Sequence, residues 1–325
     1  MKSTLLASGV AAALIALADA AVAQTTIRML SGWPKTLDNV RVAEKFVDTV
    51  KARSNGQLNI VISGPEVVPP FEQLDPVSRG AFDLAFTAGA YHTGVTGILM
   101  STDSLKADPA LIRSSGVYDW IDRYYQKKAN VRVLAIAPYS GYRIVLRTPP
   151  DAAGRIDGRK IRGTASYHGV IKELGAAPVV TDVGQIFSGL EKGVIDGYAW
   201  PRFAQVALKF YEAGAKYAMD PPFGTGASVI LANLDKFAAL KEGDRTILIE
   251  EARKIEAWSV EFFKDISAKE EAALKEKGVQ FVSWGATAGK VEGWFNEGVW
   301  KLVAQFSGKD GEDLEKLARS TGAAR

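Results

Sequence analysis

The chain contains no cysteine and only two histidines among its 325 residues. The lack of cysteine excludes a disulfide framework and all thiol chemistry. His92 and His168 are far apart in the sequence, so a hydrogen-bonding or surface role fits each better than a shared metal site. We therefore expect no metal and no other cofactor.

Signatures of the common enzyme classes are also missing. The sequence has no G-x-S-x-G elbow, no Walker loop and no H-E-x-x-H, and the "GTGASV" stretch that begins at Gly224 lacks the third glycine of a dinucleotide fingerprint. Ser166 lies two residues from His168, but proximity in sequence does not create a nucleophile–base pair. We assign no catalytic residue and expect a protein that is not an enzyme.

Neither sign of charge dominates. The formal net charge of +3 is small and spread along the chain, which gives no case for nucleic-acid binding. A small anionic ligand is compatible with this balance.

Long hydrophobic runs are absent beyond the N-terminus. There, Lys2 precedes the apolar run 5–18, and Ala21-Val22-Ala23 fits a cleavage site, so residues 1–23 are predicted to be a secretory signal peptide. A retained membrane anchor is the alternative, but the run is shorter than the ~20 residues that span a bilayer. We expect a soluble mature protein of the periplasm, without stable membrane insertion.

The mature chain begins with a β-α-β order. "TTIRMLSGW" predicts a strand, residues 38–54 have helical apolar spacing with Asp38 as N-cap and Gly56 as the stop, and "LNIVISG" predicts a buried strand. This order is typical of a layered α/β fold.

One unit occurs twice in the sequence. Residues 79–83 (RGAFD) and 192–196 (KGVID) each follow a short amphipathic helix and precede a strand, and Gly80 and Gly193 stand where the helix must end. Any β-α-Gly-β unit has this form, but similar strands, "LNIVISG" and "AAPVVTD", also lie upstream of both units. We favour two similarly built lobes with a cleft between them.

The last hundred residues do not repeat this unit. Residues 244–278 predict one helix with an apolar stripe of Leu248, Ala252, Ile255, Trp258 and Phe262. At ~1.5 Å per residue it is about 50 Å long, enough to brace both lobes. We assign residues 24–140 and 226–265 to lobe I, and residues 141–225 and 266–325 to lobe II.

Arginines and aromatic residues mark the predicted strand ends. Arg143 follows a predicted turn at Ser140–Gly141 between the strands 131–137 and 143–146, and Arg162 ends a strand in "RKIRG". Composition alone favours solvated arginines, but at a cleft their planar forks bind a carboxylate bidentately. Four aromatic residues also lie where strands meet turns. Each alone is more often part of a core than a ligand contact, but together they predict a shared pocket: Trp33, Tyr91, Tyr139 and Trp200.

At this point the whole mature chain resembles the solute-binding proteins of tripartite ATP-independent periplasmic (TRAP) transporters, of the dicarboxylate-binding type. The resemblance is carried by "AEKFVDTVKARSNGQLNIVISGPEVVPPFEQLDPVSRGAFDLAF", "GYR…DGRKIRG" and "LGAAPVVTDVGQIFSGLEKGVIDGYAWP". It implies a two-lobed α/β protein with an interlobe cleft, crossing strands and a hinge-spanning helix, which closes on an organic anion. It also implies that Arg162 pairs with the ligand carboxylate, that Arg143 assists, and that membrane subunits of the transporter are the partners.

Two departures from sialic-acid-type members bear on the ligand. Trp200 stands where those members carry an asparagine, and Ala88 and Gly89 stand where they have a glutamate. We therefore expect a monocarboxylate with an apolar or aromatic body, such as a 2-oxo or 2-hydroxy acid. A C4-dicarboxylate receptor and a carboxylate-sensing domain are alternatives, and a secreted enzyme with the same cleft is a weaker one.

Overall fold

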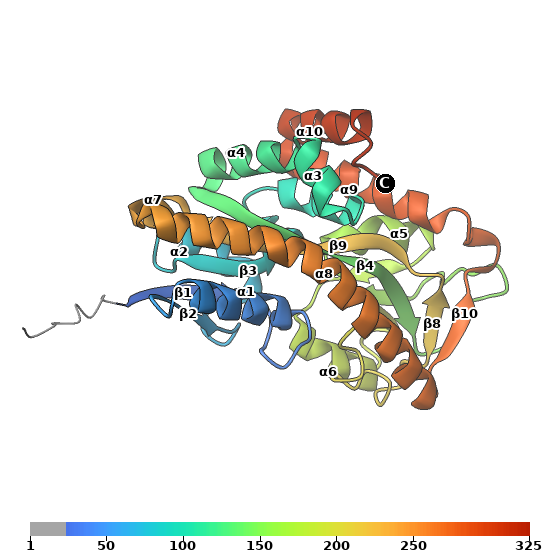
Figure 1. Cartoon of the computed structure of the whole chain (residues 1–325). Helices are drawn as coiled ribbons and strands as arrows, with labels where there is room; N and C mark the ends of the chain where they lie inside the picture. The colour runs from blue at the N-terminus through green and yellow to red at the C-terminus, as the bar shows by residue number, and fades with distance from the viewer. Residues whose placement is uncertain (1–23) are drawn as a thin grey trace, which may run out of the picture.

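The computed structural model describes residues 24–325, so the predicted signal peptide lies outside the described residues. The described chain folds around a ten-stranded sheet (Figure 1). Its strands are β1 (Thr25–Ser31), β2 (Leu58–Ser63), β3 (Leu84–Ala88), β4 (Val131–Leu146), β5 (Lys160–Arg162), β6 (Ala177–Val179), β7 (Gly197–Pro201), β8 (Tyr217–Asp220), β9 (Phe223–Asn233) and β10 (Gln280–Ser283).

Helices cover both faces of this sheet. The α-helices are α1 (Val40–Arg53), α2 (Leu74–Ser78), α3 (Pro109–Ser114), α4 (Val117–Ala129), α5 (His168–Glu173), α6 (Ile186–Glu191), α7 (Leu234–Ala239), α8 (Glu242–Glu276), α9 (Val291–Ser307) and α10 (Lys309–Ser320). Three short 3₁₀-helices matter for the site: η2 (Gly89–His92), η3 (Ile98–Ser104) and η4 (Ala165–Tyr167). Within residues 24–325, no helix is both long and apolar enough to cross a membrane.

Two long strands join the halves of the sheet. The strand order is β2-β1-β3-β9-β4-β7-β5-β6, with β8 beside β4 and β10 beside β8. The strands β1, β2 and β3 are mutually parallel, as are β5, β6 and β7, whereas β9 and β4 run antiparallel to their neighbours. The predicted two-lobed α/β fold with crossing strands is therefore confirmed, with β4 and β9 as the strands that cross.

The predicted turn at Ser140–Gly141 is wrong, because β4 continues through both residues. Gly141 has φ +69° and lies opposite Gly224 of β9, which has φ +65°, since the flanking pairs are Ser140 with Thr225 and Tyr142 with Phe223. Glycines that adopt positive φ are typical of turns, so the sequence indicated a turn here. In the structure, two such glycines instead face each other inside one ladder. This is also where the predicted lobe boundaries near residues 140 and 226 fall, and that division of the chain stays a prediction.

The doubled sequence unit is a doubled structural unit. Gly80 and Gly193 have φ +74° and +68° at the ends of α2 and α6. The Asp83 carboxylate accepts a hydrogen bond from the Arg28 N–H at 2.6 Å, and the Asp196 carboxylate accepts one from the Lys160 N–H at 2.8 Å. Each aspartate thus ties its own strand to the neighbouring parallel strand, which explains why both copies of the unit carry it.

The helix predicted from residue 38 begins two residues later. Asn39, not Asp38, occupies the capping position of α1, and its side chain makes no capping hydrogen bond. The apolar face of α1 predicted from its spacing packs inward, with Ala43, Phe46 and Val50 buried and Val47 half-buried.

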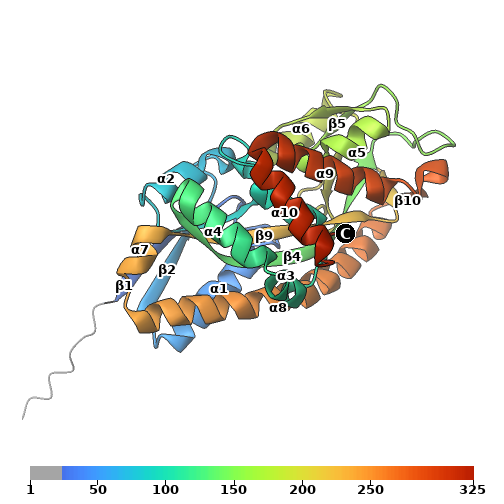
Figure 2. The same ribbon diagram turned by 90° about the horizontal axis from the view of Figure 1, so that it is seen from above.

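The long helix α8 contacts both halves of the molecule and runs diagonally across it in Figure 1. Near its middle, Glu256 forms a buried ion pair with Arg113, and further along Glu271 pairs with Arg143 and Arg202. The predicted apolar stripe shifts by one residue in the second half, where Phe263 is buried while Trp258 and Phe262 stack on each other, half-buried, at 4.5 Å. At the C-terminus, α10 lies against α4, which brings the end of the chain back to the segment 117–129 (Figure 2).

Candidate functional site

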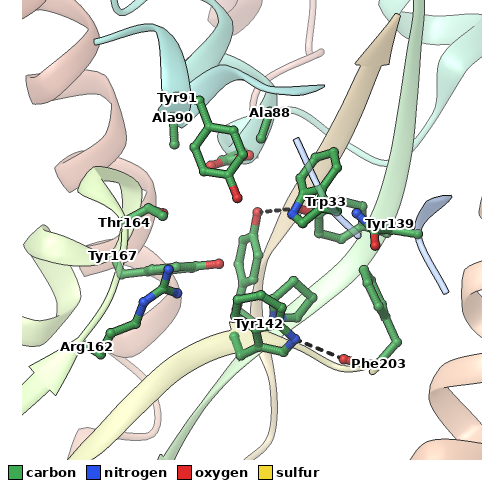
Figure 3. Close-up of a pocket in the computed structure, with 14 residues that line it drawn as sticks. Trp33, Ala88, Ala90, Tyr91, Tyr139, Tyr142, Arg162, Thr164, Tyr167 and Phe203 are labelled. Carbon is green, nitrogen blue, oxygen red and sulfur yellow. Dashed lines mark hydrogen bonds between the residues drawn. The ribbon is translucent and has the colours of Figure 1, made fainter. Parts of the chain in front are cut away.

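A small cavity of about 40 Å³ lies between the two halves of the sheet. Elements of both halves line it, and five of the six predicted site residues meet there (Figure 3). The lining consists of Trp33, Asn39, Ala88, Ala90, Tyr91, Asp103, Tyr139, Tyr142, Arg162, Thr164, Tyr167, Trp200, Pro201 and Phe203.

Arg162 is the only cation in this lining. It ends β5, is 2% exposed, and donates from Nε and Nη2 to the Thr181 carbonyl at 3.1 and 2.8 Å. Among the described residues it has no ion-pair partner within 4.0 Å. Burial lowers the pKa of its guanidinium, but an arginine stays charged at neutral pH. A buried charge without a partner is costly, so this end of the cavity favours an anion.

Trp200 is the penultimate residue of β7, the neighbouring parallel strand, and the Arg162 guanidinium carbon lies 5.4 Å from its ring centroid. Its Nε1 donates to the Phe203 carbonyl at 3.1 Å. The one polar atom of the indole is thus already bonded, and the ring adds an apolar wall beside the arginine.

Three further aromatic residues complete the predicted cluster. Trp33 and Tyr91 lie 5.6 Å apart between ring centroids, and Tyr91 also contacts Phe71 edge-on at 4.8 Å. Tyr139 of β4 packs against Phe203 at 5.3 Å. The structure therefore brings Trp33, Tyr91, Tyr139 and Trp200 together in one lining, although Tyr139 lies inside β4 and not at a strand end as predicted.

Four tyrosines line the cavity, and all four remain neutral phenols. Burial raises the pKa of Tyr91, Tyr139, Tyr142 and Tyr167. In Figure 3 the hydroxyl groups of Tyr91 and Tyr167 and the guanidinium of Arg162 point toward a common space. The cavity therefore combines one cation with several hydroxyl donors and apolar ring faces.

Arg143 is the predicted site residue that does not reach the cavity. Successive side chains of a strand point to opposite faces, so Tyr142 lines the cavity while Arg143 lies on the other side of β4. There its guanidinium donates to the Met219 carbonyl at 3.0 Å and forms ion pairs with Asp220 and Glu271. Since its charge is already paired, Arg143 ties β4 to β8 and α8.

Sequence reasoning missed five polar residues of the lining: the hydroxyl-bearing Tyr142, Thr164 and Tyr167, and Asn39 and Asp103. Asn39 precedes α1, is 3% exposed, and its Oδ1 has no hydrogen-bond partner among the described residues. Asp103 is the penultimate residue of η3, in an otherwise apolar or hydroxyl-bearing run, "ILMSTDS". A lone acid in such a run is a weak signal of a buried functional carboxyl, and the only one that the sequence offers.

Two α/β halves joined by crossing strands, with a buried unpaired arginine between them, define the class of bilobed solute-binding proteins. Within that class, the model of the bacterial extracellular solute-binding protein family 7 matches residues 32–291. The chain belongs to this family.

Relatives of known identity agree with this assignment. The chain is 26% identical to the outer membrane transporter protein TsaT of Comamonas testosteroni over 83% of each chain. It is 24% identical to a monocarboxylate 2-oxoacid-binding periplasmic protein of Nostoc sp. over 53% of this chain and 50% of that one. Among solved structures, a TRAP periplasmic solute-binding protein of Desulfovibrio salexigens with bound orotic acid superposes with a TM-score of 0.81 at 18% identity, covering 91% of this chain and 98% of that one.

Proposed function

We propose that this protein is the periplasmic receptor of a TRAP transporter and that it captures a small monocarboxylate with an apolar or aromatic body. In this account the ligand carboxylate pairs with Arg162, and the complex is delivered to the membrane subunits of the transporter. The observation that carries the proposal is the buried guanidinium of Arg162, which faces a cavity and has no carboxylate partner among the described residues.

The lining supports a monocarboxylate over a C4-dicarboxylate. Arg162 is its single cation, and the other ionisable acid group of the lining besides the tyrosines is Asp103. A second ligand carboxylate would therefore meet no counter-charge, and like charges in a water-poor site repel strongly. Arg143 does not supply the missing cation, because it is paired on the other face of β4.

The ring faces support an apolar or aromatic body over a sugar acid. Trp200 presents its ring beside Arg162, and Ala88 and Ala90 line the wall near Tyr91. The Nostoc relative is named for 2-oxoacids, and the Desulfovibrio structure holds orotic acid, a planar ring with one carboxylate. Both names fit a carboxylate on the arginine with a flat or apolar body against the aromatic wall.

A thermal-shift panel tests this proposal with the mature chain. The panel contains 4-methyl-2-oxopentanoate, phenylpyruvate, succinate and N-acetylneuraminate. A bound acid at ~100 times its dissociation constant stabilises the fold by roughly 2.7 kcal/mol, a readily measured rise in melting temperature. We expect the first two acids to give this rise. A rise with succinate or N-acetylneuraminate alone would contradict the proposed ligand class.

A further inference from the structure

Asp103 is a cavity residue to which the proposed function gives no role. It is 7% exposed, lines the same cavity as Arg162, and forms no ion pair among the described residues. Thr225 of β9 donates its hydroxyl to the backbone carbonyls of Asp103 and Leu105, at 3.1 and 2.6 Å. The backbone therefore holds this carboxyl at the cavity wall, although no cation compensates its charge.

The groups near this carboxyl are hydroxyls and the backbone N–H of Ala227. Tyr139 and Tyr142 come from β4, and Ser166 and Tyr167 from η4. The Oγ of Ser166 is buried and has no hydrogen-bond partner of good geometry among the described residues. These groups bind a neutral carboxylic acid as well as an anion, because a protonated carboxyl both donates and accepts.

Charged and titratable groups on the other elements around η3 point elsewhere. His92 of η2 bonds to Tyr125 and Thr87. Glu292 of α9 accepts from the Gly224 N–H at 2.8 Å and pairs with Arg325. Burial without a cationic neighbour raises the pKa of Asp103 to about 7, and contacts with Ser166, Tyr142 and the Ala227 N–H offset only part of this effect.

An anionic ligand in the cavity favours the neutral form of Asp103 further. With a carboxylate on Arg162, an ionised Asp103 would put two negative charges against one guanidinium in a cavity of about 40 Å³. A neutral Asp103 removes this repulsion and supplies an O–H donor at the wall. Arg162 is then free to bind the carboxylate, while the neutral acid binds an uncharged oxygen.

We propose that Asp103 is a specificity-determining residue, which enters the complex as a neutral acid and donates its proton in a hydrogen bond to an uncharged oxygen of the ligand body. A 2-oxo oxygen, a 2-hydroxy oxygen or a ring carbonyl has this chemistry. The inference rests on the proposed function, because it takes the carboxylate to lie on Arg162. According to this inference, the Asp103 carboxyl on η3 is the group that favours acids with an additional oxygen on the ligand body over acids without one.

Isothermal titration with two acids tests the assignment. The probes are 4-methyl-2-oxopentanoate and 4-methylpentanoate, which differ at C2, where the first carries the oxo oxygen. In the wild type we expect a preference of about tenfold for the oxo acid at pH 6, the equivalent of one hydrogen bond. We also expect the oxo acid to bind about tenfold more weakly at pH 8, because the neutral form of a group with pKa near 7 falls by that factor.

Variants of Asp103 distinguish hydrogen-bond donation to the ligand from a role in packing alone. Asp103→Asn keeps an N–H donor at every pH, so it should keep the preference and lose the pH dependence. Asp103→Leu should lose the preference at both pH values, and Asp119→Asn, an exposed control, should behave as the wild type. The comparison of pH 6 with pH 8 in the wild type needs no variant, so it stands even where Asp103→Leu does not fold.

Three results would overturn the inference: no preference for the oxo acid at pH 6, equal or tighter binding at pH 8, or a preference that survives in Asp103→Leu. If the wild type binds both acids equally, the inference fails while the proposed function stands. If it binds neither acid at either pH, the proposed ligand class fails as well.

Discussion

The guanidinium of Arg162 and the indole of Trp200 lie side by side at the ends of the parallel strands β5 and β7, 5.4 Å from guanidinium carbon to ring centroid. One residue supplies charge and the other an apolar face, and the Trp200 N–H is already bonded to the Phe203 carbonyl. This pair determines the kind of ligand that the cavity favours, because a ligand that binds the arginine must also contact the ring.

Replacing Trp200 tests whether the ring selects the ligand body. Trp200→Phe keeps an aromatic face, so we expect it to bind phenylpyruvate within a few-fold of the wild type. Trp200→Asn removes apolar area worth about 1.5–3 kcal/mol for a fully buried side chain, so we expect at least tenfold weaker binding by titration. Equal affinities in both variants would show that the ring does not contact the body of the ligand.

The facing glycines of the crossing strands predict a large effect from a single methyl group. Gly141 has φ +69°, a conformation that costs a residue with a Cβ about 1–2 kcal/mol, and its added Cβ would lie 3.0 Å from Pro222. We expect Gly141→Ala to lower the free energy of unfolding by at least that amount. Gly293→Ala, in an open position of α9, should instead stabilise by about 0.5–1 kcal/mol. Denaturant titration measures both, and effects of the same sign would contradict the assigned strain.

The buried ion pair between Arg113 and Glu256 should matter more than the exposed pairs of α8. The Arg113 Nε lies 2.6 Å from Glu256 Oε2, and Glu256 also accepts the Ile136 N–H at 2.8 Å. Arg113→Met leaves the carboxylate unpaired, which costs about 3–5 kcal/mol for a buried pair. Lys269→Met breaks an exposed pair with Asp265 and should cost under about 1 kcal/mol. If both variants lost the same stability in a thermal melt, the Arg113–Glu256 pair would contribute no more than an exposed ion pair.

Acid should destabilise the fold partly through His92. This ring is 2% exposed, and burial lowers its pKa from 6.5 to about 3. The unfolded chain takes up this proton below pH 6.5 while the folded chain stays neutral, so the contribution to stability is full above pH 6.5 and is lost as the pH falls toward 3. We expect the melting temperature to drop less between pH 7 and pH 4 in His92→Gln than in the wild type. An identical drop would exclude His92 as a source of the acid sensitivity.

Much of the fold follows from local patterns. The helix α8, the strands β1 and β2, and the doubled helix–glycine–strand unit were predicted because apolar periodicity and helix-ending glycines are properties of short segments. The clustering of Arg162 with Trp33, Tyr91 and Trp200 followed from a topological rule, since the ends of parallel strands meet at one edge of a sheet. Tyr139 joins them from the middle of β4, which this rule does not cover.

What failed depends on relations between distant segments. The sequence around Gly141 does not show that Gly224 faces it across a ladder, so a continuous strand was interpreted as a turn. The side of β4 on which Arg143 lies depends on the same continuity. Asn39 and Asp103 were missed because a capping position and a 3₁₀ segment have no periodicity, and only the packed cavity joins them.

The central claim is that the charge of Arg162 holds a ligand carboxylate, and titration of 4-methyl-2-oxopentanoate into Arg162→Ala tests it most directly. Lys160→Ala, an exposed cation of the same strand, is the matched control. The account predicts that Arg162→Ala abolishes measurable binding while its fold stays intact by circular dichroism, and that Lys160→Ala binds as the wild type does. Binding of the acid by Arg162→Ala with wild-type affinity would contradict the account.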